Sequence, residues 1–376
     1  SVFWPEDGDA PEFGRAAIAA YVRGDDGRLM RSLKSTLGSS LIDERTSLGA
    51  RSVSLRAVLT RYIGHLAAQL RQQVPGATRV VMGRPVHFVD DDPAADARAQ
   101  DALQAAARAH GFTEVAFQFE PIAAALEYET RLREPALVMI ADIGGGTSDF
   151  SILRLSPDRA AAADRSADIL ATYGIRLGGT DFDRILSLAE AMPYLGWLAP
   201  TRGGTGLQPR RIYLDLATWH RINQLYTQRT LTDLKAMREV ADRPELIERL
   251  ARVIQGRHGH HLLMAVEAAK IALSQADAAR IQMSAFTGGP NPMALRQRFE
   301  MASAEAMLRL TGAMRETLSR AQVARVDQVF LTGGSASLPM LTRAVHQVLP
   351  GVSLAQGDML GSVGAGLALD ARRRWG

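Results

Sequence analysis

Strand-like and helix-like patterns of apolar residues alternate along the first half of the chain. Apolar residues at helical spacing cover residues 54–74, and an apolar strand-like run follows at 78–89. An alanine-rich helical pattern then spans 92–110, and residues 114–119 predict another short strand. This alternation predicts an α/β fold, in which ligands bind at the carboxyl ends of the strands.

Residues 136–155, ALVMIADIGGGTSDFSILRL, contain two apolar runs on either side of a glycine-rich turn. The β-branched and alternating residues on both sides predict a strand, a turn and a second strand. Gly144, Gly145 and Gly146 permit positive φ angles and close backbone approach, which an anion-binding turn requires. The segment is therefore interpreted as a phosphate-binding hairpin.

Two side chains of this hairpin have suitable chemistry for a magnesium-bound phosphate. Asp142 can hold Mg²⁺ through water, because this ion usually keeps several waters, and Thr147 can donate its hydroxyl group to a terminal phosphate. A P-loop or a dinucleotide fingerprint would be followed by a helix, whereas a strand follows here. The remaining alternative on this segment alone is a hairpin whose glycines only make a turn.

Two later turns are also rich in glycine. The segment GGTDFD precedes a predicted helix, and a strand at 326–331 leads through a Gly-Gly-Ser turn to a helix that begins at Pro339. Such turns let backbone amides or a helix N-terminus approach a nucleotide. They supply five candidate contact residues, which are Gly178, Gly179, Gly333, Gly334 and Ser335.

Residues 259–274 predict a strong helix that places Glu267, Lys270 and Ser274 on neighbouring faces. The first two can alternatively form an exposed ion pair with i, i+3 spacing. A histidine group at the start of this segment, His258, His260 and His261, is interpreted as a solvated loop, because no recognisable ligand spacing accompanies it.

Composition limits the class of protein further. With 376 residues, 47% of them hydrophobic and 22% charged, the chain can bury a large core, and we expect two lobes. The formal charge of +4 without a clustered basic stripe predicts no nucleic-acid partner. The chain has no cysteine and no run of about 18 apolar residues, so we expect a cytoplasmic protein without a membrane partner.

The order of these motifs resembles the nucleotide-binding domain of the heat shock protein 70 (Hsp70) family, within the actin/hexokinase/heat-shock superfamily. DIGGGTSD resembles the second phosphate loop, FEPIAAALEYE the connecting motif, and LGGTDFD the turn that leads into the smaller lobe. EAAKIALS resembles the helix that clasps adenosine, LTGGSASLPML the adenosine-binding loop, and SLKSTLG the segment that bears a phosphate-facing lysine.

This resemblance implies an actin-like ATPase fold. Two lobes are each built on a ribonuclease H-like sheet with flanking helices, and a nucleotide cleft lies between them. Lobe I and its smaller subdomain would span residues 1–135, and lobe II would span 136–376. Residues 184–300 would form an enlarged helical subdomain, where we expect a protein partner.

The resemblance also implies ATP or ADP with Mg²⁺ as cofactors and assigns roles to single residues. Asp142 would organise the Mg²⁺ shell, and Thr147 would contact the γ-phosphate. Glu120 would orient the attacking water, and Lys34 would neutralise developing charge. The adenosine would be bracketed by Glu267, Lys270, Ser274, Gly334 and Ser335.

Three departures from the family pattern shape these expectations. The family's first phosphate loop, Asp-x-Gly-Thr, has no counterpart in residues 1–50, so we expect an incomplete N-terminus. No linker, β-sandwich or helical lid follows the nucleotide domain, so a peptide-clamping mechanism is not expected. Residues 335–337 lack the arginine that stacks on the base in typical members, which predicts weaker nucleotide binding.

The leading hypothesis is an Hsp70-like ATP-binding protein in which slow, Mg-dependent hydrolysis drives lobe closure, as in a chaperone without a peptide-binding domain. The alternatives are a nucleotide sensor that does not hydrolyse ATP, an actin-type scaffold, or a small-molecule kinase of the same superfamily. Glu120-Pro121 favours the hydrolase over the kinase.

Overall fold

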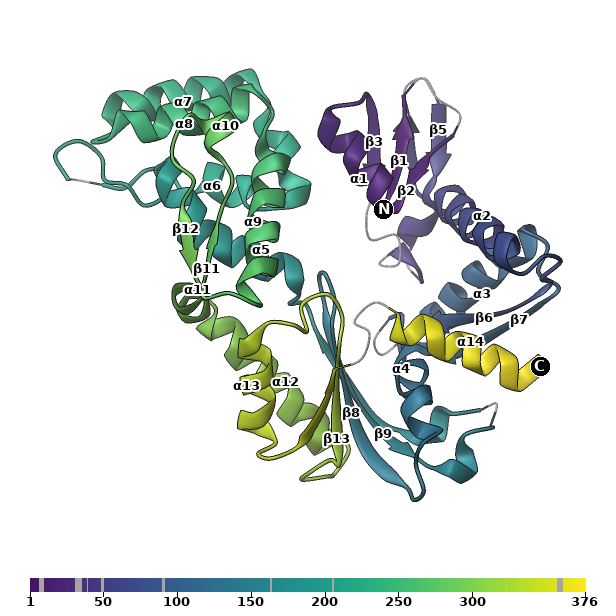
Figure 1. Cartoon of the computed structure of the whole chain (residues 1–376). Helices are drawn as coiled ribbons and strands as arrows, with labels where there is room; N and C mark the ends of the chain where they lie inside the picture. The colour runs from purple at the N-terminus through teal and green to yellow at the C-terminus, as the bar shows by residue number, and fades with distance from the viewer. Residues whose placement is uncertain are drawn as a thin grey trace. The chain divides into compact units, whose positions relative to one another are not determined.

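The chain forms two compact units, which are described separately here (Figure 1). This computed structural model describes residues 1–6, 10–30, 36–38, 40–48, 51–89, 92–162, 164–204, 206–356 and 361–376. The first unit comprises Ser1–Pro135, Leu155–Ile169 and Gly361–Gly376, and the second comprises Ala136–Arg154 and Leu170–Leu360. The two predicted lobe boundaries stay a prediction.

The first unit begins with a small antiparallel sheet in the order β2-β1-β3. Val2, Phe3 and Trp4 of its central strand are buried. The elements of this part are β1 (Val2–Pro5), β2 (Glu12–Phe13), α1 (Gly14–Arg23) and β3 (Gly27–Met30). A further antiparallel pair follows, β4 (Arg45–Leu48) with β5 (Arg51–Ser54), after the short helix η2 (Ser40–Asp43).

The next elements confirm the predicted strand and helix alternation. Ser54 caps helix α2 (Leu55–Gln73) by accepting a hydrogen bond from the amide of Ala57, and Asp92 caps α3 (Pro93–Ala109) in the same way. Strand β6 (Arg79–Arg84) pairs in parallel with β7 (Glu114–Phe119). The strand predicted over 78–89 is thus shorter than expected.

Two helices of the first unit pack closely together, α4 (Glu120–Glu129) and the C-terminal α14 (Ser362–Trp375). A Cβ atom at Gly366 would lie 1.9 Å from the carbonyl oxygen of Ala123, so only glycine fits at this contact. Helix α4 begins at Glu120, with Pro121 in its first turn. The side chain of Glu120 therefore lies at the first helical position, directly after strand β7.

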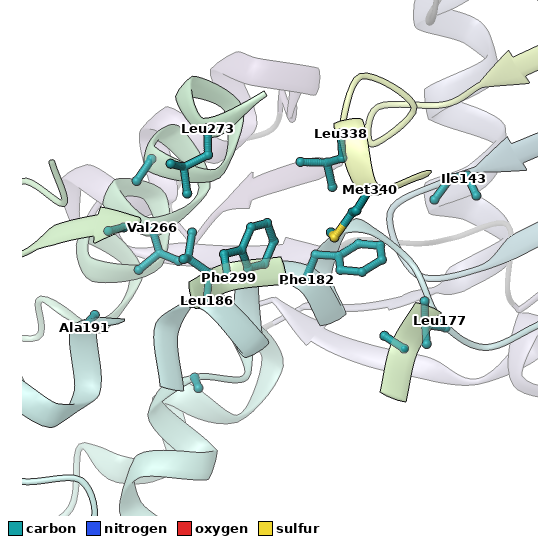
Figure 2. Close-up of a cluster of buried hydrophobic side chains, with 14 of the residues drawn as sticks. Ile143, Leu177, Phe182, Leu186, Ala191, Val266, Leu273, Phe299, Leu338 and Met340 are labelled. Carbon is teal, nitrogen blue, oxygen red and sulfur yellow. The ribbon is translucent and has the colours of Figure 1, made fainter. Parts of the chain in front are cut away.

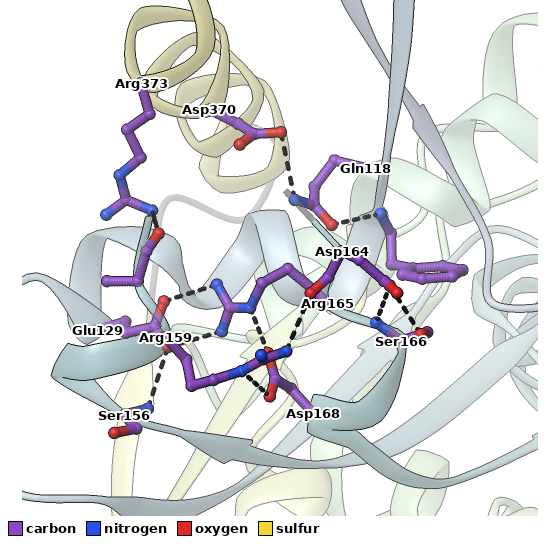
Figure 3. Close-up of polar contacts among 12 residues, drawn as sticks. Gln118, Glu129, Ser156, Arg159, Asp164, Arg165, Ser166, Asp168, Asp370 and Arg373 are labelled. Atoms are coloured by element: carbon purple, nitrogen blue, oxygen red, sulfur yellow. Dashed lines mark hydrogen bonds and ion pairs between the residues drawn. The ribbon is translucent and has the colours of Figure 1, made fainter. Parts of the chain in front are cut away.

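A buried ion network fastens the 155–169 segment to the end of α4 (Figure 3). The Arg165 guanidinium donates two hydrogen bonds to the Glu129 carboxylate, at 2.9 and 2.7 Å, and its Nε atom contacts Asp168. The side chains of Arg165 and Glu129 are 1% and 0% exposed. The segment contains the short helices η3 (Pro157–Arg159) and η4 (Ser166–Asp168).

The second unit is built on a five-stranded sheet in the order β10-β9-β8-β13-β14. Strands β8, β13 and β14 are parallel, with Asp142 of β8 opposite Thr332 of β13. The predicted hairpin is confirmed as β8 and β9. The strands are β8 (Ala136–Ile143), β9 (Ser148–Leu155), β10 (Ile169–Ile175), β13 (Gln328–Thr332) and β14 (Ser353–Gln356).

Helices fill the rest of the second unit and share one hydrophobic core with its sheet (Figure 2). Phe182 and Phe299 form an edge-to-face pair in this core, with ring centroids 6.4 Å apart. The first elements are α5 (Gly179–Leu186), η5 (Ser187–Ala191), η6 (Met192–Leu195), α6 (Arg211–Leu216), η7 (Trp219–Leu225), α7 (Gln228–Val240), α8 (Pro244–Gln255) and α9 (Gly259–Leu273). The remaining elements are β11 (Ala278–Arg280), α10 (Ser284–Thr287), β12 (Met293–Leu295), α11 (Arg296–Ala302), α12 (Ala304–Arg320) and α13 (Pro339–Val348).

The histidine group does not form the predicted solvated loop. His260 is buried at the start of α9, where its ring packs edge-on against Trp219. The rings of His258 and His261 lie 5.5 Å apart, and burial together with the neighbouring His258 lowers the pKa of His261.

Within the described residues, no group of three or more His, Asp or Glu side chains could hold a metal ion. Nor is any described helix long and apolar enough to cross a bilayer.

Replacing Arg165 with alanine should destabilise the first unit by about 3–5 kcal/mol, because the buried Glu129 carboxylate would lose its partner. Urea denaturation followed by circular dichroism measures this loss. Arg56→Ala is the matched control, since Arg56 forms an exposed ion pair with Asp43 in the same unit. A loss no larger than that of the control would contradict a stabilising role for the network.

Candidate functional site

The glycine turn between β8 and β9 presents free backbone groups at the carboxyl end of β8. The turn is closed by a 2.9 Å hydrogen bond from the Gly144 amide to the Thr147 carbonyl. A Cβ atom at Gly145 or Gly146 would meet nothing within 4 Å. Within the described residues, neither of these two amides donates a backbone hydrogen bond. They are therefore available to an anion.

A second turn, at residues 178–180, is bound to the back of the first. The Gly179 amide donates to the Gly144 carbonyl, and the Thr180 amide donates to the Gly145 carbonyl, both at 2.8 Å. A Cβ atom at Gly178 would lie 2.7 Å from both the Gly144 oxygen and the Gly146 nitrogen. Glycine is required at position 178 because these two turns pack backbone against backbone.

Lys270 holds the second turn from the other side. Its Nζ atom lies 2.8 Å from Asp183 Oδ1 and donates a 3.2 Å hydrogen bond to the Gly179 carbonyl. The Lys270 side chain is only 8% exposed, whereas Glu267 is exposed on the same helix. The alternative of an exposed Glu267–Lys270 pair is therefore wrong, because the buried ammonium group pairs with α5 instead.

The turn after β13 approaches the same place. Gly333 has a positive φ of 86°, and a Cβ atom there would lie 2.3 Å from the Ile143 carbonyl oxygen and 2.7 Å from Asp142 Oδ1. The neighbouring Gly334 is open, with nothing within 4 Å of an added Cβ. Ser335 is buried, and its Oγ would lie 2.7 Å from a Cβ atom at Gly179. Ser337 Oγ donates to Ser274 Oγ at 3.2 Å, which joins the turn to the end of α9.

The second unit thus brings most of the predicted site residues together. Three loops and one helix meet at the carboxyl ends of β8 and β13. These elements carry Asp142, Gly144, Gly145, Gly146, Thr147, Gly178, Gly179, Lys270, Ser274, Gly333, Gly334 and Ser335. Glu120 belongs to the first unit, and Lys34 lies outside the described residues.

Two residues of this arrangement were not predicted. Asp183 supplies the counter-ion of Lys270, and Thr180 adds a 2.9 Å side-chain hydrogen bond to the Gly145 carbonyl. Both stand in the GGTDFD segment, but their partners lie far along the chain. A lysine on the apolar side of a helix is the sequence signal that a buried carboxylate must exist, although it does not say which one.

Known protein families match both halves of this arrangement. A family model described as MreB/Mbl protein matches residues 57–186, and one described as Hsp70 protein matches residues 253–357. The first match contains the glycine hairpin and the 178–180 turn, and the second contains Lys270 and the turn after β13.

The curated relatives agree with these matches. The chaperone protein DnaK of Deinococcus deserti is 25% identical over 303 residues, which cover 78% of this chain and 38% of DnaK. The chain is similar to Hsp70 proteins and to MreB/Mbl proteins over different segments. The expected actin-like ATPase fold and the expected Hsp70 relationship are both confirmed.

Two chaperone proteins HscA show the same degree of similarity to this Hsp70-related chain. HscA of Citrobacter koseri is 25% identical over 387 aligned positions, which cover 98% of this chain and 52% of HscA. HscA of Klebsiella pneumoniae is 28% identical over 310 residues, which cover 81% and 39% of the two chains. The Hsp70-related chain spans about half the length, or less, of these relatives.

The two adjacent glycines of the turn after β13 should respond differently to alanine. Gly333→Ala should lower the free energy of unfolding by more than about 1 kcal/mol, because the new methyl group meets the Ile143 carbonyl at a positive φ. Gly334→Ala should change it by less than about 0.5 kcal/mol, because that position is open. Urea denaturation compares the two, and equal effects would contradict the close packing of this turn.

Proposed function

We propose that this Hsp70-related chain binds ATP and ADP with Mg²⁺ and hydrolyses ATP slowly, as a chaperone-like ATPase. The observation that carries the proposal is the pair of unpaired amides at Gly145 and Gly146, presented on a turn that is held rigidly from behind. A preorganised set of donors of this kind suits phosphate oxygens and costs little reorganisation when the ligand binds.

The donor set around this turn fits a magnesium-bound phosphate. Asp142 lies at the end of β8, and a water-coordinated Mg²⁺ needs only one or two carboxylates in addition to phosphate oxygens. The ion would neutralise charge on the phosphates. Thr147 is exposed in the turn and now donates to Asp149 Oδ2 at 3.1 Å, so its hydroxyl group can turn toward a γ-phosphate.

The adenosine would lie near the end of α9 and the turn after β13. Gly334 offers open backbone there, and Glu267 is exposed on the preceding helical turn. Ser274 accepts a hydrogen bond from Ser337, and the Ser335 hydroxyl group lies close to Gly179. Lys270 is committed to Asp183, so its contribution would be to fix the 178–180 turn as well as to add positive charge.

Hydrolysis would need groups from the first unit as well. Glu120 begins α4 and would orient the attacking water, and Lys34 would stabilise charge that develops on the γ-phosphate. We infer that nucleotide binding would draw the two units together and that hydrolysis would release them. Residues 184–300 stay our predicted place for a protein partner, and a cytoplasmic location stays a prediction.

Binding and turnover should separate in two variants. Asp142→Asn should weaken Mg-ATP binding at least about tenfold, because a charge in the metal shell is lost. Glu120→Ala should change the dissociation constant less than about threefold but slow single-turnover hydrolysis about 100-fold, as loss of a general base does. Calorimetry and quenched-flow assays of the chain with Mg-ATP measure these effects.

The exposed Asp158 of the 155–169 segment gives a matched control, Asp158→Asn, which should behave as the unchanged chain. Tight binding without turnover would overturn the hydrolase and leave a nucleotide sensor. Absence of Mg-ATP binding would overturn the proposed function altogether.

A further inference from the structure

The second unit contains a pocket that shares no residue with the glycine turns. It lies among η5, η6, α8, the turn before β12 and α11, and its volume is about 450 Å³. Pockets for small organic ligands commonly have volumes of about 300–1,000 Å³. Tyr194 and Leu246 contribute apolar surface to the pocket. Its charged lining residues are Glu190, Arg243, Arg249 and Arg298.

The glutamate is buried in an unusual stretch of backbone. Glu190 belongs to η5, a π-helical turn that continues α5, and it is only 3% exposed. Such turns are rare and often occur at functional sites. Arg298 Nε lies 3.2 Å from Glu190 Oε1, but within the described residues this oxygen receives no well-directed hydrogen bond. Burial raises the pKa of Glu190, which reflects the cost of keeping its charge there.

The three arginines give the pocket an excess of positive charge. Arg298 is 61% exposed, so its guanidinium has further donors that face away from Glu190. Arg249 lies over Gly289, where a Cβ atom would come within 2.8 Å of its side chain, and it makes a long 3.4 Å contact with the Tyr194 carbonyl. Arg243 stands at the rim and pairs with Glu245 at 2.9 Å.

Planar guanidinium groups bind carboxylates and phosphates through paired hydrogen bonds. A buried carboxylate oxygen without a well-directed donor is satisfied by a hydroxyl or ammonium group. A neutral side chain at position 190 would fill the same space without the cost of burying a charge, so Glu190 does not contribute to stability through its charge. Residues that are costly for stability are characteristic of binding sites.

We propose that this pocket binds a small organic anion whose carboxylate or phosphate group contacts Arg243 and Arg249 and whose hydroxyl or ammonium group donates a hydrogen bond to Glu190. The ring of Tyr194 and the side chain of Leu246 cover its carbon atoms. The proposal does not depend on nucleotide binding, since none of these residues belongs to the glycine turns or to α9.

The test measures binding of two probes to the nucleotide-free chain by calorimetry, at concentrations up to about 10 mM. L-glutamate carries carboxylates and an ammonium group, and glycerol 3-phosphate carries a phosphate and hydroxyls, so the pair distinguishes the two anion chemistries. At least one should bind. Glu190→Gln and Arg249→Gln should each weaken that binding about tenfold or more, because each removes a charge-assisted hydrogen bond.

Glu248→Gln and Arg229→Gln are matched controls at exposed or half-buried positions of the same helical region, and neither should change the affinity. Glu190→Gln should melt no lower than the unchanged chain, since it removes a buried charge, and both pocket variants should bind Mg-ATP as the unchanged chain does. The proposal is overturned if neither probe binds. It is also overturned if the pocket variants bind the active probe as tightly as the control variants do.

Discussion

The backbone contact between two glycine turns is the constraint on which the second unit depends. The amides of Gly179 and Thr180 donate to the carbonyls of Gly144 and Gly145. The carbonyls and the amides of the hairpin turn therefore have different roles. The carbonyls are used to hold the turn in place, and the amides of Gly145 and Gly146 remain available. The carbonyl groups of such a turn fix its position, and its free amide groups can bind an anion.

A buried ion pair between residues that are far apart in the sequence lies beside this contact. Lys270 reaches across from α9 to the Gly179 carbonyl and to Asp183, and so it fixes the start of α5 against the turn. In the first unit, Arg165 has a comparable effect on α4, whose last residue, Glu129, it binds with two hydrogen bonds. Removal of one partner from a buried ion pair leaves an uncompensated charge, so each pair opposes separation of the elements that it joins. Each unit thus uses one pair to fix a helix that carries proposed site residues.

Local signals account for the features that were predicted correctly. The hairpin at 136–155 and the helices α2 and α3 follow from periodicity, from glycine and from the capping residues Ser54 and Asp92. The pairing of Lys270 with Asp183 could not be predicted, because the two residues are far apart in sequence and many carboxylates could serve. The burial of His260 was missed for a similar reason, since its partner, Trp219, lies on a distant short helix. The family resemblance supplied the proposed site residues, and their packing shows which of them support the turns and which leave the backbone open.

The central claim is that the amides of Gly145 and Gly146 hold the phosphates of a nucleotide. The most direct measurement is a titration of the isotopically labelled chain with Mg-ATP, observed through its backbone amide resonances. The account predicts large, saturable shifts at Gly145 and Gly146, with little change at Gly203 and Gly204, which are exposed glycines elsewhere in the second unit. Saturable binding that leaves the resonances of Gly145 and Gly146 unchanged would contradict it.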